Sequence, residues 1–177
     1  MWQVQLFELN YDQREVEAVR RVVEGGWLTM GEKTKEFESA FSDYLGSNVK
    51  CTATANGTAA LHMALLACGV TPGDEVIVPA LTFVADINVV RTVGATPVLV
   101  DCASWDDWNI DPRGIKNAVS RKTKAVLAVH YAGYACDMDA IAAAIAEADV
   151  PQKVHIIEDA AHAPGADYRG RPCGTIG

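Results

Sequence analysis

Short runs of β-branched and apolar residues alternate with helical stretches over most of this chain, and this alternation restricts the fold more than any other feature. The runs that we expect to be strands are EVIVP, TPVLVD, KAVLAVHY and KVHIIED. Segments with helical spacing separate them, at about residues 58–68, 84–93 and 138–148 and after Asp111-Pro112. The strand runs are continuously apolar, as a parallel sheet covered on both faces requires. The sequence therefore predicts an α/β fold with three layers, α/β/α, and a mainly parallel sheet.

The N-terminal part of the chain, residues 1–46, has a different pattern and is expected to be a helical segment. Val16, Val19 and Val23 fall near one face of a helix that Gly25-Gly26 ends. A second amphipathic helix is expected over Glu32–Leu45, with Gly46 at its C-terminus. The residues expected to face inward on this helix are Phe37, Phe41, Tyr44 and Leu45. We expect residues 47–177 to form a βαβ core, whose first strand lies around residues 49–53.

Composition excludes several classes of partner. The net charge of −8 and the lack of a basic stripe argue against nucleic acid. No apolar stretch approaches the roughly 20 residues of a membrane-spanning helix, and the N-terminus does not resemble a signal peptide. The five cysteines are scattered and form no CxxC pair, which favours thiols in a reducing compartment over disulfides. We expect a cytoplasmic protein without a membrane or nucleic-acid partner.

Ligands of open parallel sheets gather beyond the carboxyl ends of the strands, so the residues at these ends are candidates for a site. Asn56, Gly57 and Thr58 stand where a loop becomes a helix. The free N–H groups of a helix start and the small glycine suit a phosphate, although an ordinary capped helix start has the same pattern. Phe83 follows EVIVP and either stacks on a planar ligand or packs in the core. His130 follows a later strand at the same edge.

The segment HIIEDAAHAPGA, residues 155–166, ends a buried strand with two adjacent carboxylates. Because side chains of a strand alternate, Glu158 and Asp159 are expected to point to opposite sides and not to act as one pair. A carboxylate at the end of a buried strand needs a cation or strong donors. The start of a following helix or turn is one such partner for Asp159, and an organic cation is another. A metal would need further ligands beside Asp159 and His162, and no HxxxH or HExxH pattern supplies them.

A phosphate cradle, an aromatic platform and an acid directed at a ring nitrogen together suit pyridoxal 5'-phosphate. In such a site the carboxylate keeps the pyridine nitrogen protonated, so that the ring withdraws electrons from the substrate carbon. The helix start would hold the phosphate, and the aromatic side chain would hold the face of the ring.

Several ordered blocks resemble the DegT/DnrJ/EryC1/StrS family of pyridoxal-phosphate-dependent sugar aminotransferases. These blocks are GGWLTMGEKTKEFESAFSDYLG, TANGTAALHMALLACGVTPGDEVIVPALTFVADINVVRTVGATPVLVD, VHYAGYACDMDAI and IIEDAAHAPGADYRGRPCGTIG. Together they cover nearly the whole chain. The resemblance implies the large domain of the fold-type I pyridoxal-phosphate enzymes.

The resemblance also assigns roles to single residues. It implies that Gly57 and Thr58 bind the cofactor phosphate through backbone N–H groups and that Phe83 stacks on the pyridine ring. Asp159 matches the acid paired with the ring nitrogen, and His162 matches the residue near the ring hydroxyl; these two are the expected catalytic residues.

Three further positions are less typical of the family or less defined. Thr82 falls where the family approaches cofactor and substrate, so we expect it to bind substrate. Asn56 replaces the usual serine of the family, and Asp86 stands where a small or hydroxyl residue is common. The sequence does not indicate what Asp86 does.

The Schiff-base lysine of the family lies in a segment after the block that ends here at Gly177, and none of the lysines follows Asp159. They are Lys33, Lys35, Lys50, Lys116, Lys122, Lys124 and Lys153. The small C-terminal domain of the family has no counterpart either. We therefore expect this chain to be the N-terminal part of the large domain of a longer enzyme, and to be inactive alone.

The reaction that the resemblance implies moves an amino group from an amino acid, typically glutamate, to a keto sugar that is linked to a nucleotide. The family forms homodimers, so we expect one here. A dehydration of the sugar on the same fold, with histidine in place of the lysine, is an alternative. A non-catalytic relative that binds the cofactor or has a regulatory role is another.

Overall fold

The computed structural model describes residues 8–46 and 48–177. The chain divides into two compact units, one that ends at Cys51 and one that comprises Thr52–Gly177. The second unit contains the sheet and every candidate site residue, so it is the part that determines function.

The N-terminal unit contains two helices, α1 (Gln13–Gly25) and α2 (Glu32–Leu45), as predicted. Asp12 caps α1 in a capping box with Glu15, which satisfies two N–H groups at the helix start. Gly26 ends the helix with φ at 74°, a left-handed conformation that glycine adopts without strain.

The expected burial of the aromatic face of α2 is wrong for its three aromatic residues. Phe37, Phe41 and Tyr44 are 58%, 38% and 61% exposed. They stack on one another along the helix, with ring centroids 5.8 and 6.1 Å apart. A unit of two helices has too little interior to enclose aromatic side chains.

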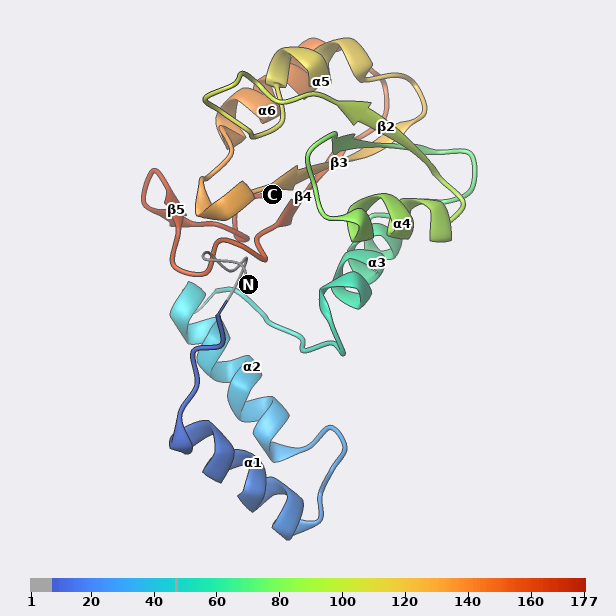
Figure 1. Ribbon diagram of the computed structural model, residues 1–177. Helices are drawn as coiled ribbons and strands as arrows, with labels where there is room; N and C mark the ends of the chain where they lie inside the picture. The colour runs from blue at the N-terminus through green and yellow to red at the C-terminus, as the bar shows by residue number, and fades with distance from the viewer. Residues whose placement is uncertain (1–7, 47) are drawn as a thin grey trace, which may run out of the picture. The chain divides into compact units, whose positions relative to one another are not determined.

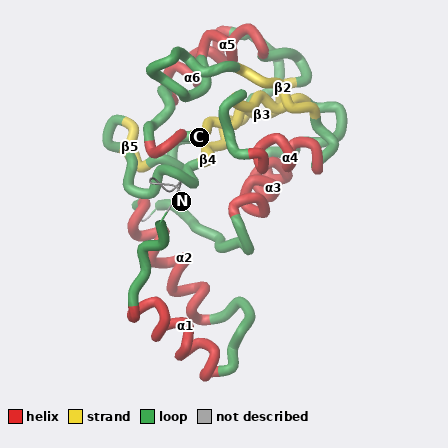
Figure 2. The backbone as a smooth tube through the Cα atoms, in the orientation of Figure 1, coloured by secondary structure: helices red, strands yellow, loops and turns green. Residues whose placement is uncertain are grey.

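The second unit is built on a four-stranded sheet of order β2-β1-β3-β4, drawn in yellow in Figure 2. All its neighbours pair in parallel. The strands are β1 (Glu75–Pro79), β2 (Thr96–Val100), β3 (Thr123–Val129) and β4 (His155–Asp159). The four apolar runs of the sequence thus become these strands, and the prediction of a parallel sheet is confirmed.

Helices cover both faces of this sheet, which confirms the three-layer α/β/α prediction (Figure 1). On one face α3 (Gly57–Ala67) and α4 (Val84–Thr92) pack in a core with Leu65, Val90 and Leu127. On the other face α5 (Pro112–Ala118) and α6 (Met138–Glu147) pack in a core with Ile115 and Ile141. Asp111 accepts a hydrogen bond from the Arg113 N–H and caps α5, with Pro112 in its first turn.

The strand expected around residues 49–53 is wrong, because this segment has no strand assignment. Exposed Lys50 and Thr52 interrupt its half-buried apolar residues. It also contains the boundary between the two units, Cys51–Thr52. An interrupted pattern at a boundary gives weaker support for a strand than the continuous runs of β1 and β3 do.

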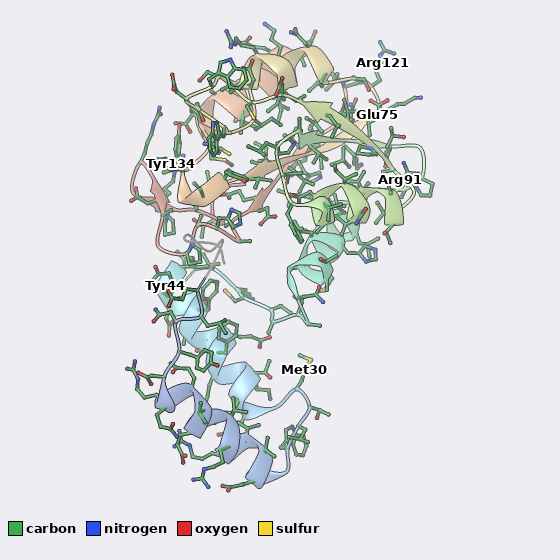
Figure 3. The ribbon with its side chains drawn as sticks, viewed as in Figure 1. Met30, Tyr44, Glu75, Arg91, Arg121 and Tyr134 are labelled. Carbon is green, nitrogen blue, oxygen red and sulfur yellow. The ribbon has the colours of Figure 1, made fainter. Side chains whose placement is uncertain are left out.

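The carboxyl ends of the strands meet at one edge of the sheet, called here the carboxyl edge. The Ala80 N–H donates to the Val100 carbonyl (2.8 Å), and the His130 N–H donates to the Asp159 carbonyl (3.1 Å). Figure 3 shows Tyr134 at this end of the sheet and Glu75, the first residue of β1, at the other.

Short elements that the sequence did not indicate follow β3 and β4 at this edge: the 3₁₀ helix η1 (Tyr131–Gly133) and the hairpin of β5 (Asp167–Tyr168) and β6 (Arg171–Pro172).

Candidate active site

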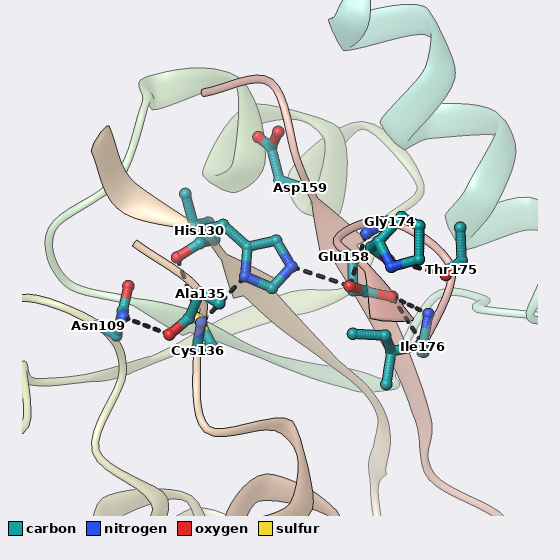
Figure 4. A network of polar contacts seen from close by, with 12 residues as sticks. Asn109, His130, Ala135, Cys136, Glu158, Asp159, Gly174, Thr175 and Ile176 are labelled. Carbon is teal, nitrogen blue, oxygen red and sulfur yellow. Dashed lines mark hydrogen bonds and ion pairs between the residues drawn. The ribbon is translucent and has the colours of Figure 1, made fainter. Parts of the chain in front are cut away.

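The last residues of β4 divide between the two faces of the sheet. Ile157 belongs to the core under α3 and α4, whereas Ile156 packs against the core under α5 and α6. Glu158 and Asp159 continue this alternation. Figure 4 shows the carboxylate of Asp159 apart from the network of polar contacts that Glu158 holds together. The prediction that the two acids do not act as one pair is therefore confirmed.

Glu158 is surrounded by hydrogen-bond donors. Its Oε2 accepts from His130 Nε2 (2.8 Å) and from the Gly174 N–H (2.7 Å). Its Oε1 accepts from the N–H groups of Ile176 and Gly177, both at 2.6 Å. The side chains of His130 and Glu158 are 0% and 3% exposed. Glu158 thus ties β3 and the end of the chain to β4.

The protonation of His130 follows from its other contact. The Cys136 N–H donates to His130 Nδ1 (3.0 Å), so Nδ1 carries no proton and Nε2–H is the donor to Glu158. Burial opposes ionisation of Glu158, but the bonds from His130 and the three backbone N–H groups outweigh it and lower the pKa of this carboxyl. His130 follows β3 at the carboxyl edge as expected, yet it is engaged in structure and is closed to a ligand.

Asp159 is the last residue of β4, and His162 lies in the loop that follows it. Asp159 is half-buried, and its Oδ1 accepts from the Ala161 N–H (2.9 Å). No lysine, arginine or histidine of the described residues forms an ion pair with it. His162 is exposed, its Nδ1 accepts from the Ala132 N–H (3.3 Å), and its ring meets the edge of Tyr131 with centroids 5.5 Å apart.

Asp86, in the first turn of α4, is fully buried and faces Asp159. Thr82 Oγ1 donates to Asp86 Oδ2, whereas Asp86 Oδ1 has no hydrogen-bond partner among the described residues. Burial raises the pKa of Asp86 to about 6, the Thr82 bond opposes this, and the charge of Asp159 adds to it. The sequence singled out Asp86 as atypical, but its contact with Asp159 joins α4 to β4 and has no sequence signal.

The N-terminus of α3 presents two backbone donors. Asn56 caps the helix through Oδ1, which accepts from the Ala59 N–H (2.9 Å). Gly57 and Thr58 are exposed, and none of the described residues accepts from their N–H groups. A Cβ added to Gly57 would meet nothing within 4 Å. The helix start is therefore both capped and open to an anion.

Phe83 immediately precedes α4 and is 68% exposed, so the alternative that it packs in the core is wrong. Its neighbour Thr82 is half-buried, because its hydroxyl is held by Asp86. The structure thus brings Thr82, Asp86 and Asp159 together, and α3 packs against both α4 and β4. In the described ranges, no three His, Cys, Asp or Glu side chains form a group that could hold a metal ion.

A comparison of the whole sequence identifies the family. The profile of the DegT/DnrJ/EryC1/StrS aminotransferase family matches residues 10–177. The chain belongs to this family.

Solved structures of similar sequence share the fold. The aminotransferase from Psychrobacter cryohalolentis is 39% identical, with a TM-score of 0.85 over 95% of this chain and 42% of that one. The aminotransferase TlmJ from Streptoalloteichus hindustanus is 33% identical, with a TM-score of 0.84 over 99% and 47%. Spr1654 from Streptococcus pneumoniae, assigned as a sugar aminotransferase, is 35% identical in its PLP form, with a TM-score of 0.86 over 94% and 45%. The expected fold, the large domain of the fold-type I enzymes, is confirmed.

The chain spans less than half the length of each of these three proteins. Among residues 8–46 and 48–177, no helix is both long enough and apolar enough to cross a membrane.

Proposed function

We propose that this chain forms the N-terminal part of the large domain of a pyridoxal-phosphate-dependent aminotransferase. One observation carries the proposal: Asp159 ends strand β4 as a half-buried carboxylate that has no cationic partner among the described residues. A carboxylate in this position, with one backbone donor, is available to a cation. The protonated nitrogen of a pyridine ring is a cation of suitable charge and shape.

The other groups at the carboxyl edge fit the same cofactor. The open N–H groups of Gly57 and Thr58 would hold its phosphate, where the partial positive charge of the helix start favours an anion. The exposed ring of Phe83 would cover the face of the pyridine ring. His162, held by the Ala132 N–H, would lie beside the ring hydroxyl.

When bound, pyridoxal phosphate supplies an electron sink for the substrate carbon. The residues of this chain would fix it in place and set its charge. Asp159 would hold a proton on the ring nitrogen, and the Ala161 N–H orients the carboxylate for that task. Thr82 would also contact the substrate. Its hydroxyl already donates to Asp86, which limits the hydrogen bonds that Thr82 could offer a substrate.

The finer parts of the proposal rest on the family and its relatives. The assignment of Spr1654 as a sugar aminotransferase supports a keto sugar as acceptor. We further propose glutamate as the amino donor, a nucleotide-linked sugar, a homodimer, and a cytoplasmic location in which the five thiols stay free. Analytical ultracentrifugation of the intact protein tests the dimer, and a monomer at micromolar concentration would contradict it.

The phosphate site offers a sharp test of cofactor binding. Gly57→Ala leaves the fold intact, because its Cβ would have space and alanine favours a helix. The added methyl group would keep a phosphate away from the backbone, so we expect the affinity for pyridoxal phosphate to fall at least about tenfold. Gly25→Ala is the matched control, since this glycine also has open space and lies in α1.

The function itself is tested on the intact protein with glutamate, a nucleotide-linked keto sugar and pyridoxal phosphate. We expect the amino sugar and 2-oxoglutarate in equal amounts. Loss of water from the sugar without amino transfer would replace the proposal with the dehydratase alternative. Failure to bind the cofactor would favour a non-catalytic relative.

A further inference from the structure

We propose that Asp86 is a positioning residue that works as a neutral carboxylic acid: its protonated Oδ1 donates a hydrogen bond to Asp159 and holds that carboxylate toward the cofactor nitrogen. This inference rests on the proposed function, because it assigns a purpose to Asp86 in the same site.

The first argument is the unpaired oxygen. Asp86 is fully buried, and its Oδ1 finds no donor among the described residues. The group that Asp86 faces is Asp159, another carboxylate, which also only accepts when ionised. Two ionised carboxylates in contact would repel each other, whereas one proton between them makes a strong hydrogen bond. A single proton therefore satisfies the orphaned oxygen and removes the repulsion.

The second argument places this proton on Asp86. Asp86 is 0% exposed, while Asp159 is half-buried and receives the Ala161 N–H. Each carboxyl receives one hydrogen bond, from Thr82 and from Ala161, so the carboxyl with less solvent is the one that keeps the proton. Burial raises the pKa of Asp86 to about 6, and the charge of Asp159 contributes in the same direction. Asp159 is the titratable group that acts on Asp86, and no described lysine, arginine or histidine forms an ion pair with Asp86.

The third argument is that Thr82 fixes the orientation. Its hydroxyl donates to Oδ2, so Oδ1 is the oxygen that remains without a partner and is free to bond to Asp159. An acid held in this way offers one O–H, as a hydroxyl side chain would. An asparagine offers the same pattern, since its carbonyl accepts from Thr82 and its amide group donates to Asp159.

The protonation is tested by infrared spectroscopy of the intact protein without cofactor. We expect the C=O stretch of a buried carboxylic acid at about pH 5, its loss as the pH rises above about 6, and its absence from Asp86→Asn at both values. A band that persists in Asp86→Asn would place the proton elsewhere and overturn the inference.

The positioning role is tested by the dissociation constant of pyridoxamine 5'-phosphate, which keeps the ring nitrogen and phosphate but forms no Schiff base. At about pH 5, where Asp86 keeps its proton, we expect Asp86→Ala to bind about tenfold more weakly, since one hydrogen bond to a charged group is lost, and Asp86→Asn to bind within about threefold of wild type. In the Asp159→Asn background, Asp86→Ala should add no further loss, because its effect passes through Asp159.

Three results contradict the inference. Asp86→Ala could bind like wild type, or its loss could be the same with and without Asp159, as a purely structural defect would give. A wild-type protein that does not bind the ligand overturns the proposed function and this role with it, while the infrared band still reports on the proton. Should Asp86→Ala fail to fold, the acid band of wild type and its absence from Asp86→Asn decide the question.

Discussion

The neighbouring carboxylates Glu158 and Asp159 end the same strand and have opposite fates. Glu158 is closed in by one imidazole and three backbone N–H groups, all within 2.8 Å. Asp159 receives a single backbone N–H and faces a second acid, Asp86, whose Oδ1 has no donor among the described residues. A fully satisfied acid stabilises the fold, whereas an acid with spare capacity is available to a ligand.

The two sides also respond to pH in opposite directions. Hydrogen bonds lower the pKa of Glu158 against the effect of burial, so the fold favours the charged form of this acid. On the other side, burial raises the pKa of Asp86 to about 6. The predictions below separate the two sides, from the largest expected effect to the smallest.

Asp159→Asn should abolish most of the turnover of the intact enzyme while leaving its melting temperature nearly unchanged. The ring nitrogen would lose the carboxylate that keeps it protonated, and we expect a loss of about two or more orders of magnitude in kcat. Steady-state amino transfer from glutamate measures it. Turnover close to wild type would show that Asp159 is not the partner of the cofactor.

Glu158→Gln should have the opposite effect. It should lower the stability of the protein without a comparable loss of turnover per folded molecule. The amide group would place its own donors against His130 Nε2–H and the Gly174 N–H, and we expect the free energy of unfolding to fall by about 3 kcal/mol. Urea denaturation measures this loss. Faster hydrogen exchange at the Ile176 and Gly177 amides should accompany it, and unchanged protection there would contradict the assigned network.

The free energy of unfolding should depend on pH through two groups, Glu158 at low pH and Asp86 at higher pH. A variant of each group should remove the contribution of that group. For Glu158, a lowered pKa means that its stabilisation is present above the unfolded value and is lost as pH falls through the folded one. For Asp86, a raised pKa means that its contribution to the free energy of unfolding is complete below the pKa of the unfolded chain. This contribution is lost as pH rises through about 6, the pKa in the folded protein. We expect the second loss to reach about 2–3 kcal/mol.

Asp86→Asn should remove the loss of stability at higher pH, because the amide cannot ionise. The variant should match wild type near about pH 4 and be more stable at about pH 8. Denaturation curves across this range give the comparison. An Asp86→Asn protein that loses stability with pH as wild type does would show that Asp86 ionises without cost.

Asn56→Ala should have the smallest effect, about 1 kcal/mol of stability, since the N-cap of α3 loses its bond to the Ala59 N–H. Asn56→Ser is the control, because serine caps helices well and is the usual family residue. If the phosphate binds to the backbone of Gly57 and Thr58, Asn56→Ser should keep the cofactor affinity of wild type. A large loss in this control would indicate a direct contact from Asn56.

Much of the fold was predictable, because its signals are local. The continuous apolar runs gave β1 to β4, and the helices between them began and ended within a residue or two of expectation. Strand alternation separated Glu158 from Asp159. The segment 49–53 was misjudged because polar residues interrupt it, and the aromatic face of α2 because a helix pattern shows an apolar face without showing what covers it.

The contacts that define the two sides were not predictable, because they join residues distant in sequence. His130 meets Glu158 across 28 positions, and Asp86 meets Asp159 from another element. Neither pair has a motif. The residues alone left the roles of Gly57, Thr58 and Phe83 open between alternatives. The family resemblance chose between these alternatives and added a role for His162, and all four roles stay predictions.

The most direct test of the difference between the two carboxylates is the protonation state of the bound cofactor. Pyridoxamine 5'-phosphate labelled with ¹⁵N in its ring, bound to the intact protein, reports it through the nitrogen chemical shift. The account predicts a protonated ring nitrogen in wild type and in Glu158→Gln, and an unprotonated one in Asp159→Asn. A ring nitrogen that stays protonated in Asp159→Asn, or loses its proton in Glu158→Gln, would contradict the account.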